Sequence, residues 1–156
     1  MIELNIPGQG IFQIEYLVSD VNGTLALDGA LLPGVASIIR KLHERIKVYL
    51  ITIDSHLKQN LIDSQISKKA KIIQKGQDAH QKSEFVKHLG AINDIAIGQE
   101  AKDSQMLKTT ATGICVLSEE GPFVDTMLSS DLVFPDGLSA LKLIQNPLRM
   151  VATLRR

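Results

Sequence analysis

The chain has 156 residues, of which 44% are hydrophobic, and its 17 Lys and Arg balance 17 Asp and Glu, so the formal net charge is zero. This length predicts one domain, spanning residues 1–156, with a core that is stable without disulfides, and the composition excludes wholesale disorder. The charge balance argues against a nucleic acid or an anionic membrane as the main partner, while weak repulsion between copies permits a homo-oligomer.

The first elements differ from the rest of the chain. Two apolar segments, residues 2–6 and 11–18, flank Pro7-Gly8-Gln9-Gly10 and predict a β-hairpin. Residues 24–32 read as a short extended segment that is broken by a tight turn at Asp28-Gly29. Pro33 then opens a helix that continues to about Arg45 and has one apolar face.

Short apolar strands alternate with amphipathic helices from there on. Strands are predicted at residues 48–53, 70–73, 95–97, 114–117 and 132–134, and helices at 55–64, 78–90, 103–108, 123–129, 137–145 and 147–154. Ser55 and Asp78 are predicted as N-caps, and Gly90 as the residue that ends a helix. The alternation is typical of an α/β fold with a parallel sheet.

The cysteine content and the hydropathy pattern indicate the cellular compartment in which the protein is expected. Cys115 is the sole cysteine and lies in an apolar segment, so we expect a buried, inert thiol and a reducing environment. Residues 1–5 lack the basic and apolar regions of a signal peptide, and no run approaches the roughly 18 apolar residues of a membrane span. We therefore expect a cytoplasmic protein.

Polar residues follow the apolar strands at comparable positions. Asp20 ends the strand that precedes Asn-Gly-Thr, Thr52 ends the next strand, Lys82 lies early in a helix and Asp103 follows Gly98. Because equivalent ends of parallel strands meet at one edge of a sheet, we expect these side chains to share a crevice. Asp20 could act there as a phosphoryl-accepting nucleophile, with Mg²⁺ between it and the phosphate, Thr52 donating to a phosphate oxygen, Lys82 neutralising charge and Asp103 holding the metal.

The same residues resemble the motifs of the haloacid dehalogenase (HAD) superfamily. The segment Asp20-Val21-Asn22-Gly23-Thr24-Leu25 resembles the first motif, Asp-x-Asp-Gly-Thr-Leu, and Leu50-Ile51-Thr52 resembles the second. Lys82 is similar to the third motif, and residues 95–103 with Met106-Leu107 are similar to the fourth. More narrowly, residues 22–29, 32–35 and 146–156 resemble the soluble P-type ATPase-like branch of the superfamily.

This resemblance implies a fold, a reaction and a metal. The fold would be a HAD-like Rossmannoid three-layer α/β/α domain with a central parallel sheet, an N-terminal β-hairpin and the nucleophile strand at the centre. No cap domain is expected, because about 8 residues separate Thr24 from Pro33 and about 17 separate Thr52 from Ala70. The activity would be Mg²⁺-dependent hydrolysis of a phosphorylated small molecule or nucleotide through an aspartyl-phosphate at Asp20. The metal ligands would be Asp20, the backbone carbonyl of Asn22, and Asp103.

Four positions depart from the superfamily pattern. Asn22 replaces the aspartate that serves as general acid and base, which predicts slow hydrolysis because such help is typically worth about 10²–10⁴-fold. In the fourth motif Gln99, Glu100 and Lys102 replace the usual residues; Glu100 could supply a ligand, or the Lys102 ammonium could occupy the place of the cation. The alternative function is therefore a catalytically inactive phosphate-binding, protein-binding or oligomeric scaffold module.

Structural and functional interpretations of single residues stay open at this point. Considered alone, Asp20 could cap a turn without any catalytic role. Thr52 could be an ordinary β-branched strand residue, and Lys82 could lie on an exposed helix surface. Asp54 suits the N-terminal anion of the following helix, although a phospho-receiver domain would use it as the acceptor.

Overall fold

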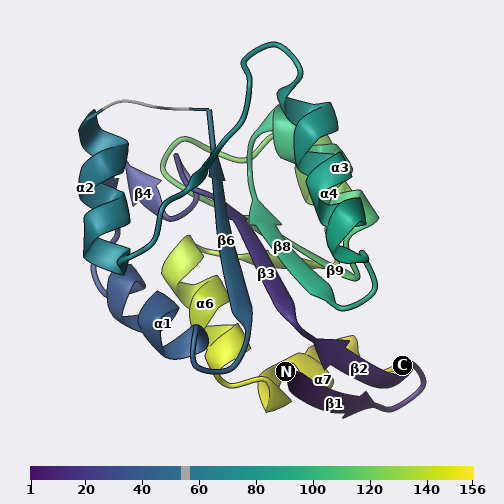
Figure 1. The fold of residues 1–156 in the computed structure, drawn as a ribbon. Helices are drawn as coiled ribbons and strands as arrows, with labels where there is room; N and C mark the ends of the chain where they lie inside the picture. Colours follow the sequence, from purple (N-terminus) through teal and green to yellow (C-terminus); the bar gives the residue numbers. More distant parts are fainter. Residues whose placement is uncertain (54–56) are drawn as a thin grey trace.

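The computed structural model describes residues 1–53 and 57–156 and contains a six-stranded parallel sheet (Figure 1). The strands are β3 (Tyr16–Asp20), β6 (Lys47–Thr52), β7 (Lys71–Ile72), β8 (Asp94–Gly98), β9 (Thr112–Val116) and β10 (Leu132–Phe134). Their order across the sheet is β10-β9-β8-β3-β6-β7, and every pair is parallel. The strand that ends in Asp20 is therefore central, between β6 and β8.

Helices cover both faces of this sheet. One face contacts α1 (Val35–Leu42), α2 (Leu57–Ile66) and α6 (Gly137–Gln145), and the other contacts α3 (Asp78–Leu89), α4 (Ser104–Thr109) and α5 (Val124–Leu128). Successive strand residues enter opposite clusters: Leu17 and Ile95 belong to the first, Val18 and Ala96 to the second. The predicted three-layer α/β/α class is thus confirmed.

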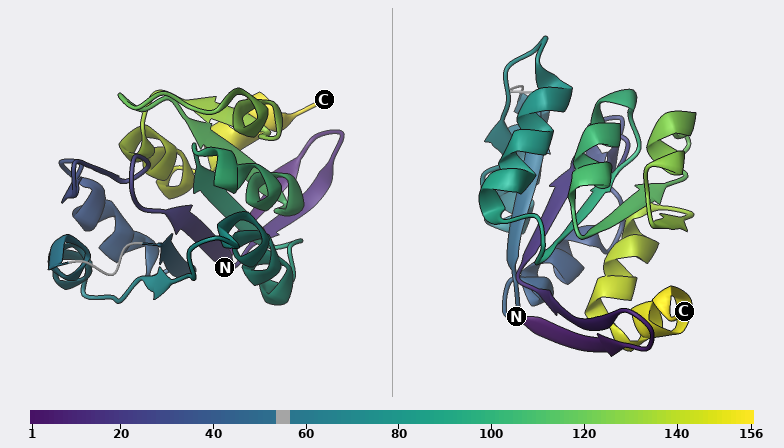
Figure 2. Two further views of the ribbon diagram at one scale, coloured as in Figure 1. Left: turned by 90° about the horizontal axis from the view of Figure 1, so that it is seen from above. Right: turned by 90° about the vertical axis from the view of Figure 1, so that its right-hand side faces the viewer.

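The N-terminal hairpin is present but shorter than predicted. It consists of β1 (Ile2–Ile6) and β2 (Gly10–Ile14), which are antiparallel, and it lies beside α7 (Leu148–Leu154) at one end of the sheet (Figure 2). The predicted second arm, residues 11–18, is divided between β2 and β3. The division occurs because the amides of Glu15 and Tyr16 donate to the carbonyl of Asn93, which moves the chain into the parallel sheet.

A second small hairpin follows β3. It pairs β4 (Ala26–Leu27) with β5 (Ala30–Leu31) through the predicted turn, where Asp28 and Gly29 have φ angles of 52° and 82°. This hairpin and α1 are the elements between β3 and β6, so no lid is inserted there.

The two ends of α3 differ in how well they match the sequence prediction. Gly90 ends α3 with a φ of 115°, as predicted, but the N-cap of α3 is Gln77, and Asp78 is the first helical residue. Asp78 does not cap because its carboxylate accepts from the amide of Gly76 and pairs with Lys102. The predicted Ser55 cap and the candidate Asp54 lie outside the described residues.

The sequence also predicts a buried Cys115 thiol and no membrane-spanning segment. Cys115 is buried in β9, and burial, with a smaller contribution from Asp103, raises the pKa of its thiol to about 11, which suits an inert cysteine. Among the helices of residues 1–53 and 57–156, none has both the length and the apolar character of a membrane span.

Candidate active site

Asp20 lies at the carboxyl end of β3, in a turn that the backbone closes tightly. The carbonyl of Val21 accepts from the amides of Thr24, Leu25 and Ala26 at 3.2, 2.9 and 3.0 Å. The Asp20 side chain is almost fully buried, and its Oδ2 accepts from the Thr24 hydroxyl at 3.3 Å. The carboxylate is therefore held at the sheet edge by the residues that follow it in sequence.

Lys82 joins this carboxylate to a second one. Its side chain has 0% exposure, and its Nζ lies 2.8 Å from Asp20 Oδ1 and 2.6 Å from Asp103 Oδ1. The other oxygen of Asp103 accepts from the amides of Gln99 and Glu100 at 2.9 and 3.0 Å. A single buried ammonium from α3 thus bridges the end of β3 and the loop after β8.

The Asn22 side chain contacts the neighbouring strand β6 instead. Its Nδ2 donates to the Thr52 hydroxyl at 3.3 Å, which connects the turn after Asp20 to the end of β6. The structure therefore brings Asp20, Asn22, Thr52, Lys82 and Asp103 to one edge of the sheet. Their catalytic and metal-binding roles remain predictions.

The electrostatics of this cluster are unbalanced toward negative charge. Burial, together with the nearby Asp103, raises the pKa of Asp20 to about 8, although Lys82 acts to lower it. Burial alone would lower the pKa of Lys82, but the two carboxylates outweigh burial and raise it. Burial and Asp103 also raise the pKa of the half-buried Glu100. One buried ammonium does not compensate three neighbouring carboxyl groups.

A divalent cation fits this charge distribution. Within the described ranges no group of three or more His, Cys, Asp and Glu side chains has metal-binding geometry. Mg²⁺, however, is usually held by one or two carboxylates together with waters and substrate phosphate. Asp20 and Asp103 supply two carboxylates, and the part of the raised pKa of Asp20 that Asp103 causes, which is smaller than the part caused by burial, is one that a bound cation would offset.

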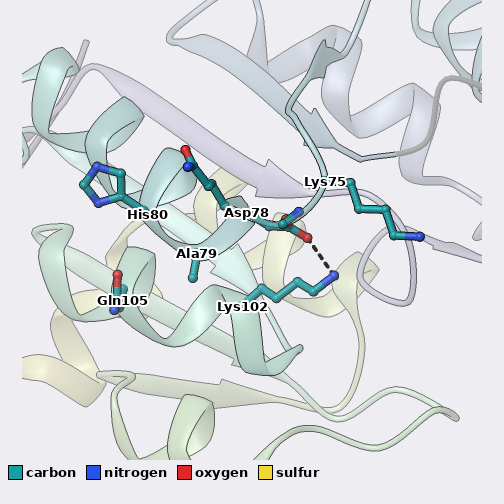
Figure 3. Close-up of a pocket in the computed structure, with 8 residues that line it drawn as sticks. Lys75, Asp78, Ala79, His80, Lys102 and Gln105 are labelled. Carbon is teal, nitrogen blue, oxygen red and sulfur yellow. Dashed lines mark hydrogen bonds and ion pairs between the residues drawn. The ribbon is translucent and has the colours of Figure 1, made fainter.

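Lys102 does not stand between the two carboxylates. Its Nζ lies 2.6 Å from Asp78 Oδ2, and its side chain is 44% exposed whereas that of Asp78 is 4% exposed. Figure 3 shows Lys102 reaching toward Asp78, while Lys75 points away from this pair. They border an open cleft of about 840 Å³ at the start of α3. The idea that Lys102 occupies the cation's place is therefore not supported, because Lys82 provides the bridging ammonium.

Sequence reasoning missed the role of the loop after β9. Gln99 is 1% exposed, and its Nε2 donates to Glu120 Oε2 at 3.0 Å while its Oε1 accepts from the Ser118 hydroxyl. The Gln99 and Glu120 side chains lie directly on Gly23, where an added Cβ would collide with Gln99 Nε2 and Glu120 Oε2. Gly23 also has a φ of 73°, so both the lack of space for a Cβ and the backbone conformation require glycine at this position. No local pattern marks Glu120, because its approach to Gly23 is a tertiary contact.

Comparison with known proteins gives one sequence relative and several structural ones. No family model matches the chain. An uncharacterized protein of Methanocaldococcus jannaschii is 46% identical over 61 residues, which are 39% of this chain and 66% of that protein. The chain therefore spans slightly less than two thirds of that relative's length.

The structural relatives are HAD hydrolases. The cobalt-bound deoxy-D-mannose-octulosonate 8-phosphate phosphatase of Haemophilus influenzae has a TM-score of 0.69 and 15% identity, with 89% of each chain covered. The 3-deoxy-D-manno-octulosonate 8-phosphate phosphatase of Moraxella catarrhalis, in complex with magnesium, phosphate and KDO, has a TM-score of 0.69 and 18% identity, with 91% and 94% covered. A Streptomyces avermitilis protein assigned to the HAD hydrolases has a TM-score of 0.68 and 12% identity, with 86% and 84% covered.

At these identities the comparison establishes the fold. The chain has the HAD-like three-layer fold with a central parallel sheet that the four sequence motifs predicted. The Moraxella and Haemophilus phosphatases contain bound magnesium and cobalt, respectively.

Proposed function

We propose that this protein is a HAD-type Mg²⁺-dependent phosphohydrolase that acts through an aspartyl-phosphate at Asp20. The observation that carries the proposal is the buried Asp20–Lys82–Asp103 cluster, with Nζ–O distances of 2.8 and 2.6 Å, at the carboxyl end of the central strand. Ligands of open α/β sheets bind at the carboxyl ends of the strands. The buried Lys82 ammonium between two carboxylates provides a preformed, water-poor environment for phosphate there.

Each side chain has a defined task in this proposal. An Asp20 oxygen attacks phosphorus while the bond to the alcohol oxygen breaks, and water later displaces Asp20 to release phosphate. Lys82 orients the Asp20 carboxylate and offsets negative charge on the phosphoryl group. Thr52 and the Asn22 amide offer hydrogen-bond donors to the phosphate oxygens. Asp20, Asp103 and the carbonyl of Asn22 would hold Mg²⁺, which when bound neutralises charge on the phosphate.

The substrate class follows from the open architecture and from the sequence resemblance. A phosphorylated small molecule or a nucleotide is proposed, and residues 22–29 favour a soluble P-type ATPase-like member of the superfamily. Because residues 1–53 and 57–156 form no cap over the site, we propose that a large substrate or a neighbouring subunit of a homo-oligomer covers it. A cytoplasmic location is also proposed, from the cysteine content and the hydropathy pattern of the sequence.

A second candidate is a non-catalytic module that binds phosphate or a protein. It is favoured by Asn22, which cannot exchange a proton, and by the 3% exposure of Asp20, which restricts access to the nucleophile. The two candidates differ in their response to Mg²⁺ and beryllium fluoride, a phosphoryl mimic. Stabilisation by beryllium fluoride that requires Mg²⁺ and Asp20 favours the enzyme, because ligands that bind only the native state raise its stability.

The direct test is turnover of an aryl phosphate by the purified protein. Release of phosphate from p-nitrophenyl phosphate should require Mg²⁺ and should disappear in Asp20→Asn. Asp125→Asn, which changes an exposed carboxylate on α5 in the same chemical way, is the matched control and should retain full activity. Activity that survives in Asp20→Asn would contradict the proposal, and absence of activity in the wild type would favour the non-catalytic module.

A further inference from the structure

The Glu120 carboxylate is held against the nucleophile turn by a residue from a different strand. Glu120 follows β9, and its Oε2 accepts from Gln99 Nε2 at 3.0 Å. The same oxygen lies so close to Gly23 that a Cβ at that position would collide with it. Gly23 directly follows Asn22, so an ionisable carboxyl group lies next to the position that lacks one.

Several hydrogen bonds fix the loop that carries this carboxylate. The Ser118 hydroxyl donates to Gln99 Oε1 and accepts from the Glu120 amide at 3.2 Å. The amide of Phe123 donates to the Gln99 carbonyl at 2.9 Å, so both ends of the loop are tied to the end of β8. This arrangement gives a reason for glutamine at position 99, because an acidic residue there could not donate to Glu120 and would repel it.

A cavity lies between this loop and the turn that follows Asp20. Its volume is about 260 Å³, and Gly23, Thr24 and Ser118 form part of its wall. Leu27 and Pro135 give the wall apolar character. The cavity therefore touches both the nucleophile turn and the loop that positions Glu120.

We propose that Glu120 is the general acid and base that Asn22 cannot be. This inference rests on the proposed function. In the first step, protonated Glu120 gives its proton to the alcohol oxygen as the phosphorus–oxygen bond breaks and Asp20 becomes phosphorylated. In the second step, the Glu120 carboxylate takes a proton from the attacking water as the bond between phosphorus and Asp20 breaks. Phosphate leaves, and Asp20 and Glu120 return to their starting states.

Glu100 is another carboxyl group near the cluster, and it has a different task. Its side chain accepts from the amide of Asp103 in a capping box, and Asp103 in turn accepts from the amide of Glu100. Glu100 therefore stabilises the turn that presents Asp103, whereas Glu120 contacts the nucleophile turn itself.

The test compares the two chemical steps in Glu120→Gln, with Glu44→Gln as the matched control on an exposed residue outside the site. With 2,4-dinitrophenyl phosphate the first turnover should be as fast as in the wild type, because that leaving group needs no proton. Later turnovers should be slowed about 10²-fold, so that an initial burst of dinitrophenolate appears. With an alkyl phosphate the first turnover should itself slow by about 10²-fold. Equal slowing of the first turnover for both substrates would show a merely structural role and overturn the assignment.

Restoring the missing acid gives an independent check. The variant Asn22→Asp places a carboxyl group at the position where the superfamily pattern has one. In that background, the further substitution Glu120→Gln should reduce the turnover of an alkyl phosphate less than about threefold, because the two carboxyl groups would be redundant. An undiminished loss of about 10²-fold in that background would overturn the inference. Failure of the proposed function gives a different result, since neither the wild type nor Asn22→Asp would then release dinitrophenolate in an Asp20-dependent manner.

Discussion

Replacing Asp20 should stabilise the protein in the absence of added metal at neutral and alkaline pH. The pKa of Asp20 is raised from 3.8 to about 8, chiefly by burial and then by Asp103. Between these two values the unfolded chain has lost the proton that the native protein keeps. The contribution of Asp20 to stability is therefore fully present below pH 3.8 and is lost as the pH rises toward 8.

The size of the effect follows from the same linkage. Each pH unit in this interval costs about 1.4 kcal/mol, so the titration of Asp20 lowers the stability of the native state at pH 7 by up to about 4 kcal/mol relative to its value below pH 3.8. The variant Asp20→Asn has no proton to release at this position, and its amide oxygen could still accept from Lys82. The asparagine amide group places an additional donor beside the Lys82 ammonium, and this mismatch offsets part of the gain, so we expect a net stabilisation at pH 7 on the order of 2 kcal/mol.

The assay is urea denaturation of the wild type and Asp20→Asn in EDTA at pH 5 and pH 8. The free energy of unfolding of the variant, relative to the wild type, should rise by about 3–4 kcal/mol between the two pH values, because only the wild type loses stability as Asp20 titrates. Asp125→Asn, the exposed control, should show no such rise. A difference that is the same at both pH values, or that falls as the pH rises, would refute the electrostatic reasoning.

Three further substitutions test other parts of the site. Lys82→Met should destabilise the protein by about 3–5 kcal/mol in urea denaturation, because it leaves two buried carboxylates without their cation. Lys102→Met should cost less than about 1 kcal/mol by the same measurement, because the ion pair with Asp78 is partly exposed and screened by water. Gly23→Ala should cost more than about 1 kcal/mol and should lower the melting temperature, because alanine is strained at a φ of 73° and its Cβ would displace Glu120.

The fold was largely predictable because its signals are local. Alternating apolar strands and amphipathic helices specify a parallel α/β sheet, and the Asp28-Gly29 turn adopts the positive φ angles that such a pair favours. The divided hairpin was missed because residues 11–18 form one largely apolar segment. Only the distant carbonyl of Asn93, which receives the amides of Glu15 and Tyr16, sets the division between β2 and β3.

The candidate site was predictable only where its residues follow strands. Asp20 and Thr52 could be placed at one edge from the chain alone, because the carboxyl ends of parallel strands share that edge. The partners of Lys102 and Gln99 could not be found in this way. Asp78 has the pattern of a helix cap, and Glu120 lies in a loop without a motif, so both contacts depend on how separate elements meet in space.

The position of β3 at the centre of the sheet also affects how the protein folds. Its two neighbours, β6 and β8, pair with it across about 30 and about 80 residues of intervening chain. Such long-range pairing requires the closure of large loops and slows folding, whereas the β1–β2 hairpin can form early from adjacent residues. Asp20, Lys82 and Asp103 meet only once all three central strands are aligned. Recovery of the site during refolding would therefore report the completion of the sheet, later than the recovery of helical or hairpin signals.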